Sequence, residues 1–469
     1  MLFRFSLAAV IGVLFISCGG PEPAEDMPVA EEPISEVSET KILRTSDGPI
    51  RNIVLISVDT LRSDHMGIYG YDRNTTPEID SFFEGGTVYE NAYATTSRTP
   101  PSVVSFLSGL LPQHHDVRLF NTRVSSTLTT LPKLLREQGY ECAAVVSNQV
   151  LSGDWMGLDT HFDHYDDEVT EKEPNRDQYE RSAKPTTDAA IEWLESREYP
   201  DKPFFLWVHY MDPHGPYTPP TPKVKEFSHS TPKNIDVGLL PKYQRFPGIT
   251  DGLEYVDLYD EEIANLDQEA GRLLDALAPI TADGETLFAF TADHGETLMD
   301  HEQWFRHDYQ VYEELVRVPL LVRGGGLAKT RFGGRVSNMD IVPTALELAE
   351  LDVPDNLDGV SLLNPVNDRN IFIESGLSKT FWTGVIADSG KWLTVREMRQ
   401  GGRNAFFRFD LVNDPRETKP IRYDPRATAD AAPVAMFALY KTKPYVDAAP
   451  EEELSAEKEE ELRSLGYVD

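Results

Sequence analysis

The stretch "TLFAFTADHGE", Thr286–Glu296, joins an apolar run typical of a buried strand to the polar residues Asp293 and His294. In the segment "NIVLISVDT", an apolar run is likewise followed by an acidic residue, Asp59. In "FFLWVHYMDPHGPY", His214 lies shortly after the apolar run. In an open α/β sheet, ligands bind beyond the carboxyl ends of the strands. Acidic or histidine side chains that follow three expected strands therefore predict one shared site at one edge of a sheet.

From Arg51 onward, apolar strand-like runs alternate with amphipathic helix-like segments, which predicts an α/β/α sandwich with a mainly parallel central sheet. The expected strands include "CAAVVS", and the expected helices include "TTDAAIEWLESRE" and "YDEEIANLDQEAGRLLDAL". After about Asp368 the runs shorten, as in "NIFIES" and "KWLTVRE", and predict a small antiparallel sheet. We therefore expect a catalytic α/β domain over residues 51–367 and a small α+β subdomain with a tail over residues 368–469.

The composition restricts the partners. The chain has 469 residues, of which 40% are hydrophobic, and its net charge is −34. Such a charge repels phosphate backbones, so we exclude nucleic acid as a partner. An anionic substrate needs a local cationic site, such as a metal ion, to overcome the field of the protein.

The first twenty residues, "MLFRFSLAAVIGVLFISCGG", have a basic start at Arg4 and an apolar run too short to span a membrane, which is typical of a secretory signal. The segment ends at Cys18 like a bacterial lipobox, so we expect residues 1–18 to be a lipoprotein signal and Cys18 to be lipidated. An ordinary signal peptide with a chance cysteine is the alternative. Residues 19–50 should form an acidic, disordered tether. The predicted location is the bacterial cell envelope, anchored by lipid on the periplasmic or outer-membrane side.

Asp59, Asp293 and His294 offer the oxygen and nitrogen ligands that a divalent metal ion prefers. Each residue also has a simpler interpretation, since an aspartate after a strand often caps a helix and an Asp-His-Gly segment can be only a turn. His214, between prolines, can equally brace a loop. The occurrence of all these residues at the ends of expected strands favours a site for one divalent ion. Zn or Mn is preferred because a histidine is present, and Ca or Mg are the alternatives.

Thr99 stands at the start of "RTPPSVVSFLSGLLP", Arg98–Pro112, directly before two prolines. Threonine is a good helix N-cap and proline is favoured in the first helical turn, so capping is one interpretation. The other is a nucleophile held at the positive end of a helix dipole. These residues alone leave both open.

Four segments together resemble sulfatase-like proteins of the alkaline phosphatase superfamily, in the order that the family keeps. They are "VDTLRSDHMGIYGY", "HYMDPHGPYTPP", "TADHGETLMDHEQWFRHDYQVYEELVRVPLLV" and "FDLVNDPRET". The resemblance runs from about Arg51 to Glu417 and implies an alkaline-phosphatase-like fold. It also places Thr99 in the position of the family's nucleophile, with capping as a second role.

The sequence departs from the sulfatase pattern at the nucleophile. A threonine cannot become formylglycine, the motif arginine is replaced by Val103, and the segment with paired lysine and histidine reads "VSNQVLS", which includes Asn148. A direct threonine nucleophile resembles lipoteichoic acid synthases and lipid A phosphoethanolamine transferases. That resemblance implies a metal set of Asp59, Thr99, Asp293 and His294.

The resemblance further implies that His214 and His307 contact the transferring group or protonate the leaving group, and that Asn148 helps to bind substrate. We predict a metal-dependent hydrolase or transferase that acts on anionic phosphate or sulfate esters of glycans or lipids through Thr99, with phosphate esters favoured. A true sulfatase acting on extracellular sulfated glycans, and a non-catalytic binding lipoprotein, are the alternatives.

Overall fold

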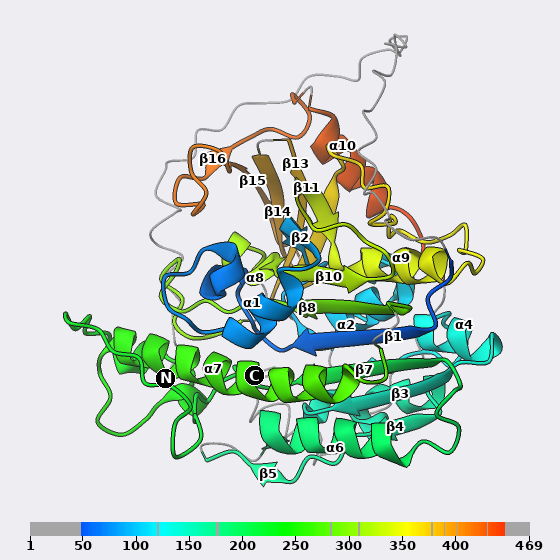
Figure 1. Cartoon of the computed structure of the whole chain (residues 1–469). Coiled ribbons are helices and arrows are strands. Elements are labelled where there is room, and N and C mark those ends of the chain that lie inside the picture. Colours follow the sequence, from blue (N-terminus) through cyan, green and yellow to red (C-terminus); the bar gives the residue numbers. More distant parts are fainter. Residues whose placement is uncertain are drawn as a thin grey trace, which may run out of the picture. The chain divides into compact units, whose positions relative to one another are not determined.

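The computed structural model describes the middle of the chain (Figure 1). The described residues are 48–445 apart from 120–121, 175–177, 282–283, 308–309, 377–378, 389, 400 and 429. The described residues all belong to one compact unit. The predicted signal segment and lipobox, and nearly all of the predicted tether, lie outside the described residues. No helix among the described residues is both long enough and apolar enough to cross a membrane.

The central sheet has the strand order β11-β2-β10-β8-β1-β7-β3-β4, with β9 paired to β2. Strand β10 runs antiparallel to β8 and β2, and the other neighbours along this order are parallel. The mainly parallel sheet expected from the sequence is therefore confirmed. The strands are β1 Asn52–Val58, β2 Thr87–Tyr93, β3 Glu141–Val146, β4 His164–Asp166, β7 Phe204–Tyr210, β8 Thr286–Ala292, β9 Arg317–Val318, β10 Leu320–Gly324 and β11 Thr330–Ser337.

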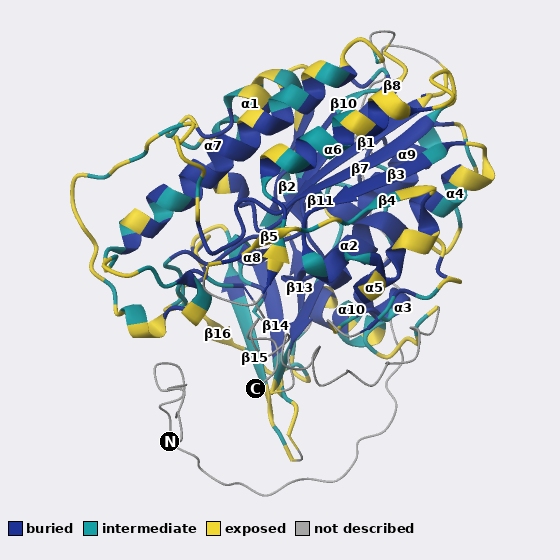
Figure 2. Cartoon of the chain, turned by 90° about the horizontal axis from the view of Figure 1, so that it is seen from below, coloured by how far each residue is buried: buried dark blue, intermediate teal, exposed yellow. Residues whose placement is uncertain are grey.

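Helices cover both faces of this sheet, because successive residues of each strand point to opposite sides. In β1, Val54 and Ile56 pack with one hydrophobic cluster, and Ile53 and Leu55 pack with the other. Figure 2 shows the strands buried between the helices. The main covering helices are α1 Pro77–Phe83, α2 Thr99–Ser108, α4 Leu131–Glu137, α6 Ala183–Ser196, α7 Gly252–Leu277 and α9 Ile341–Leu348.

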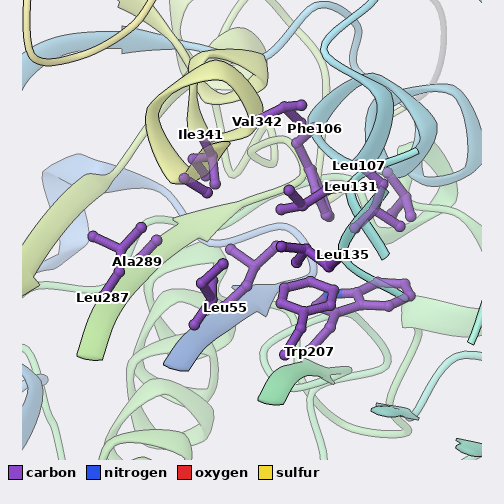
Figure 3. Packing of buried hydrophobic residues seen from close by; sticks show 14 of the residues in the cluster. Leu55, Phe106, Leu107, Leu131, Leu135, Trp207, Leu287, Ala289, Ile341 and Val342 are labelled. Atoms are coloured by element: carbon purple, nitrogen blue, oxygen red, sulfur yellow. The ribbon is translucent and has the colours of Figure 1, made fainter. Parts of the chain in front are cut away.

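The cluster under α2, α4 and α9 fixes the helix that carries Thr99. Leu55 and Trp207 from the sheet meet Phe106 of α2, Leu131 of α4 and Ile341 of α9 (Figure 3). Each large side chain that is fully buried in this way contributes about 1.5–3 kcal/mol. This packing holds α2 rigidly against the sheet, with its first turn beside the carboxyl end of β8.

Helix α7 begins earlier than the sequence pattern predicts. The apolar periodicity predicts a start near Tyr259, whereas the helix begins at Gly252. The side chain of Asp251 accepts a hydrogen bond from the Leu253 amide and caps the helix. The extra turns carry Asp257 and run beside the Pro213–Gly248 segment, which contains only two short 3-10 turns, as expected of a long loop.

The carboxy-terminal part forms a separate antiparallel sheet of the order β12-β13-β14-β15-β16, as the shortened runs predict. Met436 of α10, Ala431–Leu439, packs against Val385 and Trp392 of this sheet. The strands are β12 Ile371–Gly376, β13 Thr380–Ala387, β14 Gly390–Glu397, β15 Asn404–Asp410 and β16 Ile421–Arg422.

Lys391 of β14 joins this sheet to the segment around α8, Glu313–Val316. Its side chain is fully buried, and Nζ lies 2.9 Å from Glu313 Oε1 and 3.0 Å from Glu417 Oε1. Nζ also donates to the Val311 carbonyl at 2.9 Å. Glu417 belongs to the segment "FDLVNDPRET", so one physical role of that segment is to supply a carboxylate to a buried ion cluster.

We expect Lys391→Ala to destabilise the protein by about 3–5 kcal/mol, because it leaves the buried Glu417 carboxylate and the partly buried Glu313 carboxylate without their cation. The free energy of unfolding from urea titration measures the loss. Lys441→Ala removes an exposed lysine and should change it by less than about 0.5 kcal/mol. A Lys391→Ala protein as stable as this control would show that the buried ion cluster does not stabilise the contact between this sheet and the segment around α8.

Candidate active site

The parallel pairing of β1 and β8 brings two acidic residues together. Val58 pairs with Ala292, so Asp59 and Asp293 follow at the same level of the sheet. The Asp293 amide donates to the Val58 carbonyl at 3.1 Å, and the Asp59 amide donates to the Tyr210 carbonyl of β7 at 2.9 Å. These backbone bonds fix the places of both carboxylates at the edge of the sheet.

Asp59, Asp293 and His294 are fully buried, and each offers a ligand atom within 4.8 Å of the others. Asp59 Oδ1 and Asp293 Oδ2 have no hydrogen-bond partner in the described part of the chain. His294 Nδ1 donates to the Gly295 carbonyl at 2.9 Å, so Nε2 carries the lone pair that can bind a metal ion. Nε2 lies 3.4 Å from Asp293 Oδ2 and 3.9 Å from Asp59 Oδ1. Two open carboxylate oxygens and one imidazole nitrogen fit a divalent cation.

The charges at this site also favour a cation. Burial and the neighbouring Asp59 carboxyl raise the pKa of Asp293 well above its usual range. Burial also opposes ionisation of Asp59, but His214, His209 and His294 outweigh it and hold the pKa of Asp59 below its usual range. Burial, together with His307, lowers the pKa of His294 to about 3, so its imidazole is neutral, as a metal ligand must be.

Another group of three possible ligands, His301, Glu314 and Glu417, lies within the same distance limit. Here the Lys391 ammonium, 3.0 Å from Glu417 Oε1, already supplies a positive charge. The site at Asp59 and Asp293 has no such lysine among its described ion pairs and is the better candidate for a metal.

Thr99 is the first residue of α2, and the N-cap position belongs to Arg98. No side chain caps this helix, so the expectation that Thr99 has capping as a second role is wrong. The Thr99 hydroxyl oxygen instead lies 3.3 Å from His294 Nε2, and its side chain is buried. One turn along, Ser102 Oγ donates to the Asp293 carbonyl and ties the helix to the end of β8. The Thr99 hydroxyl is thus held beside the candidate metal ligands.

His294, His307 and His214 form a row of buried rings. The His307 ring centroid lies 4.5 Å from that of His294 and 5.1 Å from that of His214. His307 Nδ1 lies 3.3 Å from Glu296 Oε1, and this buried carboxylate can hold a proton on the ring. His307 therefore lies next to His294, whose Nε2 contacts the Thr99 hydroxyl, and His214 lies next to His307. Both rings are candidate proton donors at this site.

Asn148 contacts a metal-ligand candidate. Its Nδ2 donates to Asp59 Oδ2 at 2.6 Å, and its Oδ1 accepts from the Val150 amide at 3.0 Å. Asn148 therefore orients the Asp59 carboxylate. Its expected contact with substrate stays a prediction.

His209 of β7 is a site residue that the sequence pattern misses. Its Nε2 lies 3.7 Å from Asp59 Oδ2 and has no hydrogen-bond partner among the described residues. Its Nδ1 lies 2.8 Å from Ser57 Oγ. The Ser57 oxygen accepts a hydrogen bond from Trp207 Nε1, so the Ser57 hydroxyl donates its own hydrogen to His209 Nδ1. In this tautomer the ring proton of His209 is on Nε2, toward Asp59. The available signal was a single histidine inside the otherwise apolar run "FFLWVHY".

Comparison with known proteins gives a consistent result. The Sulfatase family model matches residues 51–351. An arylsulfatase of Clostridium perfringens (strain 13 / Type A) is 26% identical, over 78% of this chain and 89% of its own length.

Among solved structures, one in complex with its substrate D-glucosamine-2-N,6-O-disulfate has a TM-score of 0.64 at 21% identity. It covers 84% of this chain and 97% of its own. The phosphonate monoester hydrolase of Agrobacterium radiobacter has a TM-score of 0.62 at 20% identity, over 89% of this chain and 96% of its own. At these identities, the two structures show the shared fold.

Proposed function

The chain belongs to the sulfatase family, and on this premise we propose that it is a metal-dependent ester hydrolase with Thr99 as its nucleophile. One observation carries the proposal. The Thr99 hydroxyl oxygen lies 3.3 Å from His294 Nε2, beside carboxylate oxygens of Asp59 and Asp293 that have no hydrogen-bond partner among the described residues. A hydroxyl in this place is positioned for activation as a nucleophile.

Asp59, Asp293 and His294 would hold one divalent ion, with the Thr99 oxygen as a further ligand. When bound, such an ion lowers the pKa of a hydroxyl and offsets negative charge on the group that is transferred. The metal set and its stoichiometry are part of the proposal, as is the preference for Zn or Mn over Ca or Mg.

The chain's own residues then supply two steps. The Thr99 hydroxyl first releases its proton to solvent. Its oxygen then attacks the phosphorus of the ester, and the bond from phosphorus to the alcohol oxygen breaks. His307 or His214 gives the leaving oxygen a proton, so that a neutral alcohol departs. Water, or an acceptor hydroxyl in a transferase, next attacks the phosphorus and gives its proton to the histidine that protonated the leaving group. The bond between phosphorus and Thr99 breaks, and the Thr99 oxygen takes a proton from solvent. The products are phosphate or a new ester, and the Thr99 hydroxyl is restored.

Phosphate esters are the favoured substrates. A threonine adduct has no easy route to eliminate sulfate, whereas the aldehyde hydrate of formylglycine has one. Val103, which stands in place of the motif arginine, is fully buried within the hydrophobic cluster under α2 and adds no positive charge. The fold itself is compatible with phosphorus esters, because the similar Agrobacterium structure is named a phosphonate monoester hydrolase.

A true sulfatase acting on sulfated glycans is the second candidate, and the names of the relatives favour it. The similar proteins include an arylsulfatase and a structure bound to a disulfated glucosamine. The two candidates differ in the ester that is cleaved, whereas a binding protein without catalytic activity would cleave neither.

A panel of p-nitrophenyl phosphate, p-nitrophenyl phenylphosphonate and p-nitrophenyl sulfate tests these candidates on the metal-loaded protein. We expect kcat/KM for a phosphorus ester to exceed that for the sulfate ester at least about tenfold, a difference of about 1.4 kcal/mol in transition-state stabilisation. A reversed order would support the sulfatase. Absence of turnover with all three, by a protein that holds its metal, would contradict an esterase of this type.

We also propose that the protein is a lipoprotein of the bacterial cell envelope, anchored through Cys18. The Cys18→Ser protein should move from the membrane fraction to the soluble fraction, because the lipid would be its hydrophobic anchor. Cys142→Ser is the matched control, since Cys142 is buried in the fold, and this variant should stay with the membrane. Continued membrane association of Cys18→Ser would contradict the lipid anchor.

A further inference from the structure

An acidic pocket adjoins the candidate active site. Its volume is about 260 Å³, and His214 forms part of its wall. We call it the acidic pocket because four carboxylates line it. They are Glu171, Glu180, Asp212 and Glu262.

Among the described residues, one lysine and no arginine line this pocket. Lys184 is the lysine of the lining, and its ammonium is already paired with Asp188 one helical turn along α6. Asp212 is only 8% exposed, and its Oδ1 accepts a hydrogen bond from Asn265 Nδ2 at 3.4 Å. Its Oδ2 accepts none from an amide, a hydroxyl or a cationic group in the described part of the chain. A buried carboxylate oxygen left open toward a cavity is costly unless a cation or donor arrives to occupy it.

Asp212 and Glu262 are both buried, and their carboxyls lie within hydrogen-bonding reach of each other. Burial raises the pKa of Asp212, and burial together with the Asp212 carboxyl raises the pKa of Glu262 well above its usual range. Two such carboxyls can both ionise only when a positive charge is close to them. Binding of a cation would therefore allow both carboxyls to ionise, and the pair favours a cation in the pocket.

The shape of the pocket fits an organic cation better than a metal ion. Neither group of three metal ligands among the described residues includes a carboxylate of the acidic pocket. Met211, Pro216 and Pro220 add carbon surface to the lining. A volume of about 260 Å³ is below the usual range of ligand pockets and suits one small alcohol or one sugar unit.

We propose that the acidic pocket binds an ammonium group on the alcohol half of the ester substrate. His214 links the two places, since it lines the pocket and packs against His307, which in turn packs against His294. The substrate class is thus an ester whose alcohol carries a primary or quaternary ammonium, as in an amino alcohol or an amino sugar. This inference rests on the proposed function, because it assigns the substrate of the same site.

Matched pairs of esters test the preference for a positive charge. Phosphocholine is compared with 3,3-dimethylbutyl phosphate, its neutral isostere, and glucosamine 6-phosphate with glucose 6-phosphate. We expect kcat/KM to favour the cationic member at least about tenfold in one pair, and that pair identifies an amino alcohol or an amino sugar as the source. If the ester panel favours sulfates, the corresponding sulfate esters replace these four.

Glu262→Gln keeps the shape of the side chain and removes its charge, so it should reduce this preference at least about fivefold. Comparing two esters on one variant cancels any general change in activity, and thermal melting checks the fold. Glu195→Gln removes an exposed carboxylate on α6, outside the pocket, and should leave the preference intact.

Titration calorimetry with choline and with glucosamine provides a readout without turnover. Binding of one of them that weakens in Glu262→Gln supports the inference, even if no ester is cleaved and the proposed function fails. Turnover of esters with equal kcat/KM for cationic and neutral members, and no binding of either cation, overturns the inference and leaves the proposed function standing. Loss of both turnover and binding overturns both.

Discussion

The Thr99→Ala protein should fold as the wild type does and lose turnover by at least about three orders of magnitude. A nucleophile that forms a covalent intermediate has no substitute once its hydroxyl is gone. The stability should change little, because Thr99 occupies the first helical position of α2 and its hydroxyl caps no amide. Initial rates with the best ester of the panel give the loss, and thermal melting gives the folded fraction.

Thr99→Ser should retain measurable turnover, because a hydroxyl stays in place beside His294. Thr344→Ala is the matched control, since Thr344 is equally buried but lies on α9, where its hydroxyl donates to the Asp340 carbonyl. This control should keep turnover near the wild-type level. A folded Thr99→Ala protein with near wild-type rates would contradict the nucleophile assignment.

Asp293→Ala should lose the bound metal ion together with turnover. Its Oδ2 has no partner among the described residues and lies 3.4 Å from His294 Nε2, so its removal opens the ligand set. We expect elemental analysis to give about one divalent ion per wild-type chain and less than about a tenth of that in the variant, in line with the loss of a ligand. Zn or Mn should be found before Ca or Mg.

His301→Ala provides the matched control for the metal. It removes one member of the other three-ligand group, where Lys391 already supplies positive charge, and should leave the metal content unchanged. An Asp293→Ala protein that keeps its full metal content would contradict the ligand assignment. Metal loss in His301→Ala, with Asp293→Ala unaffected, would move the metal to the second group.

The central sheet and the carboxy-terminal sheet could be predicted because their strands are apolar runs with turn residues between them. An aspartate directly follows each of β1 and β8, and parallel strands place such residues at one edge of the sheet. β10, Leu320–Gly324, was not predicted, since its antiparallel direction depends on partners far away in the sequence. The early start of α7 was missed because its cap, Asp251, and the glycine that follows it directly continue a loop rich in proline and polar residues.

The site residues also divide into those that local sequence reveals and those that only the fold brings together. Asp59, Asp293 and His294 stand out in the sequence because they follow apolar strands directly. His209 and Asp212 do not stand out in the sequence, because their roles depend on contacts with side chains that are distant in the chain. Asn148 lies 89 residues from Asp59 in the chain, and no local pattern reveals their hydrogen bond.

Thr99 was ambiguous for a related reason. The prolines that follow it suit a helix start under either interpretation, and the difference lies in where its hydroxyl goes. That is decided by the packing of α2 against the end of β8, which brings the Thr99 oxygen to 3.3 Å from His294 Nε2. A segment of fifteen residues carries no information on a partner almost two hundred positions away.

The most direct test of Thr99 as the nucleophile is mass spectrometry of the protein quenched with acid during turnover. With a phosphate ester, we predict the added mass of one phosphoryl group on the intact chain, located by peptide mapping on Thr99 and absent from Thr99→Ala. With a sulfate ester, a sulfuryl group at the same residue would keep the nucleophile and change the substrate. Steady turnover with no adduct on Thr99, or with the adduct on another residue, would contradict the central claim.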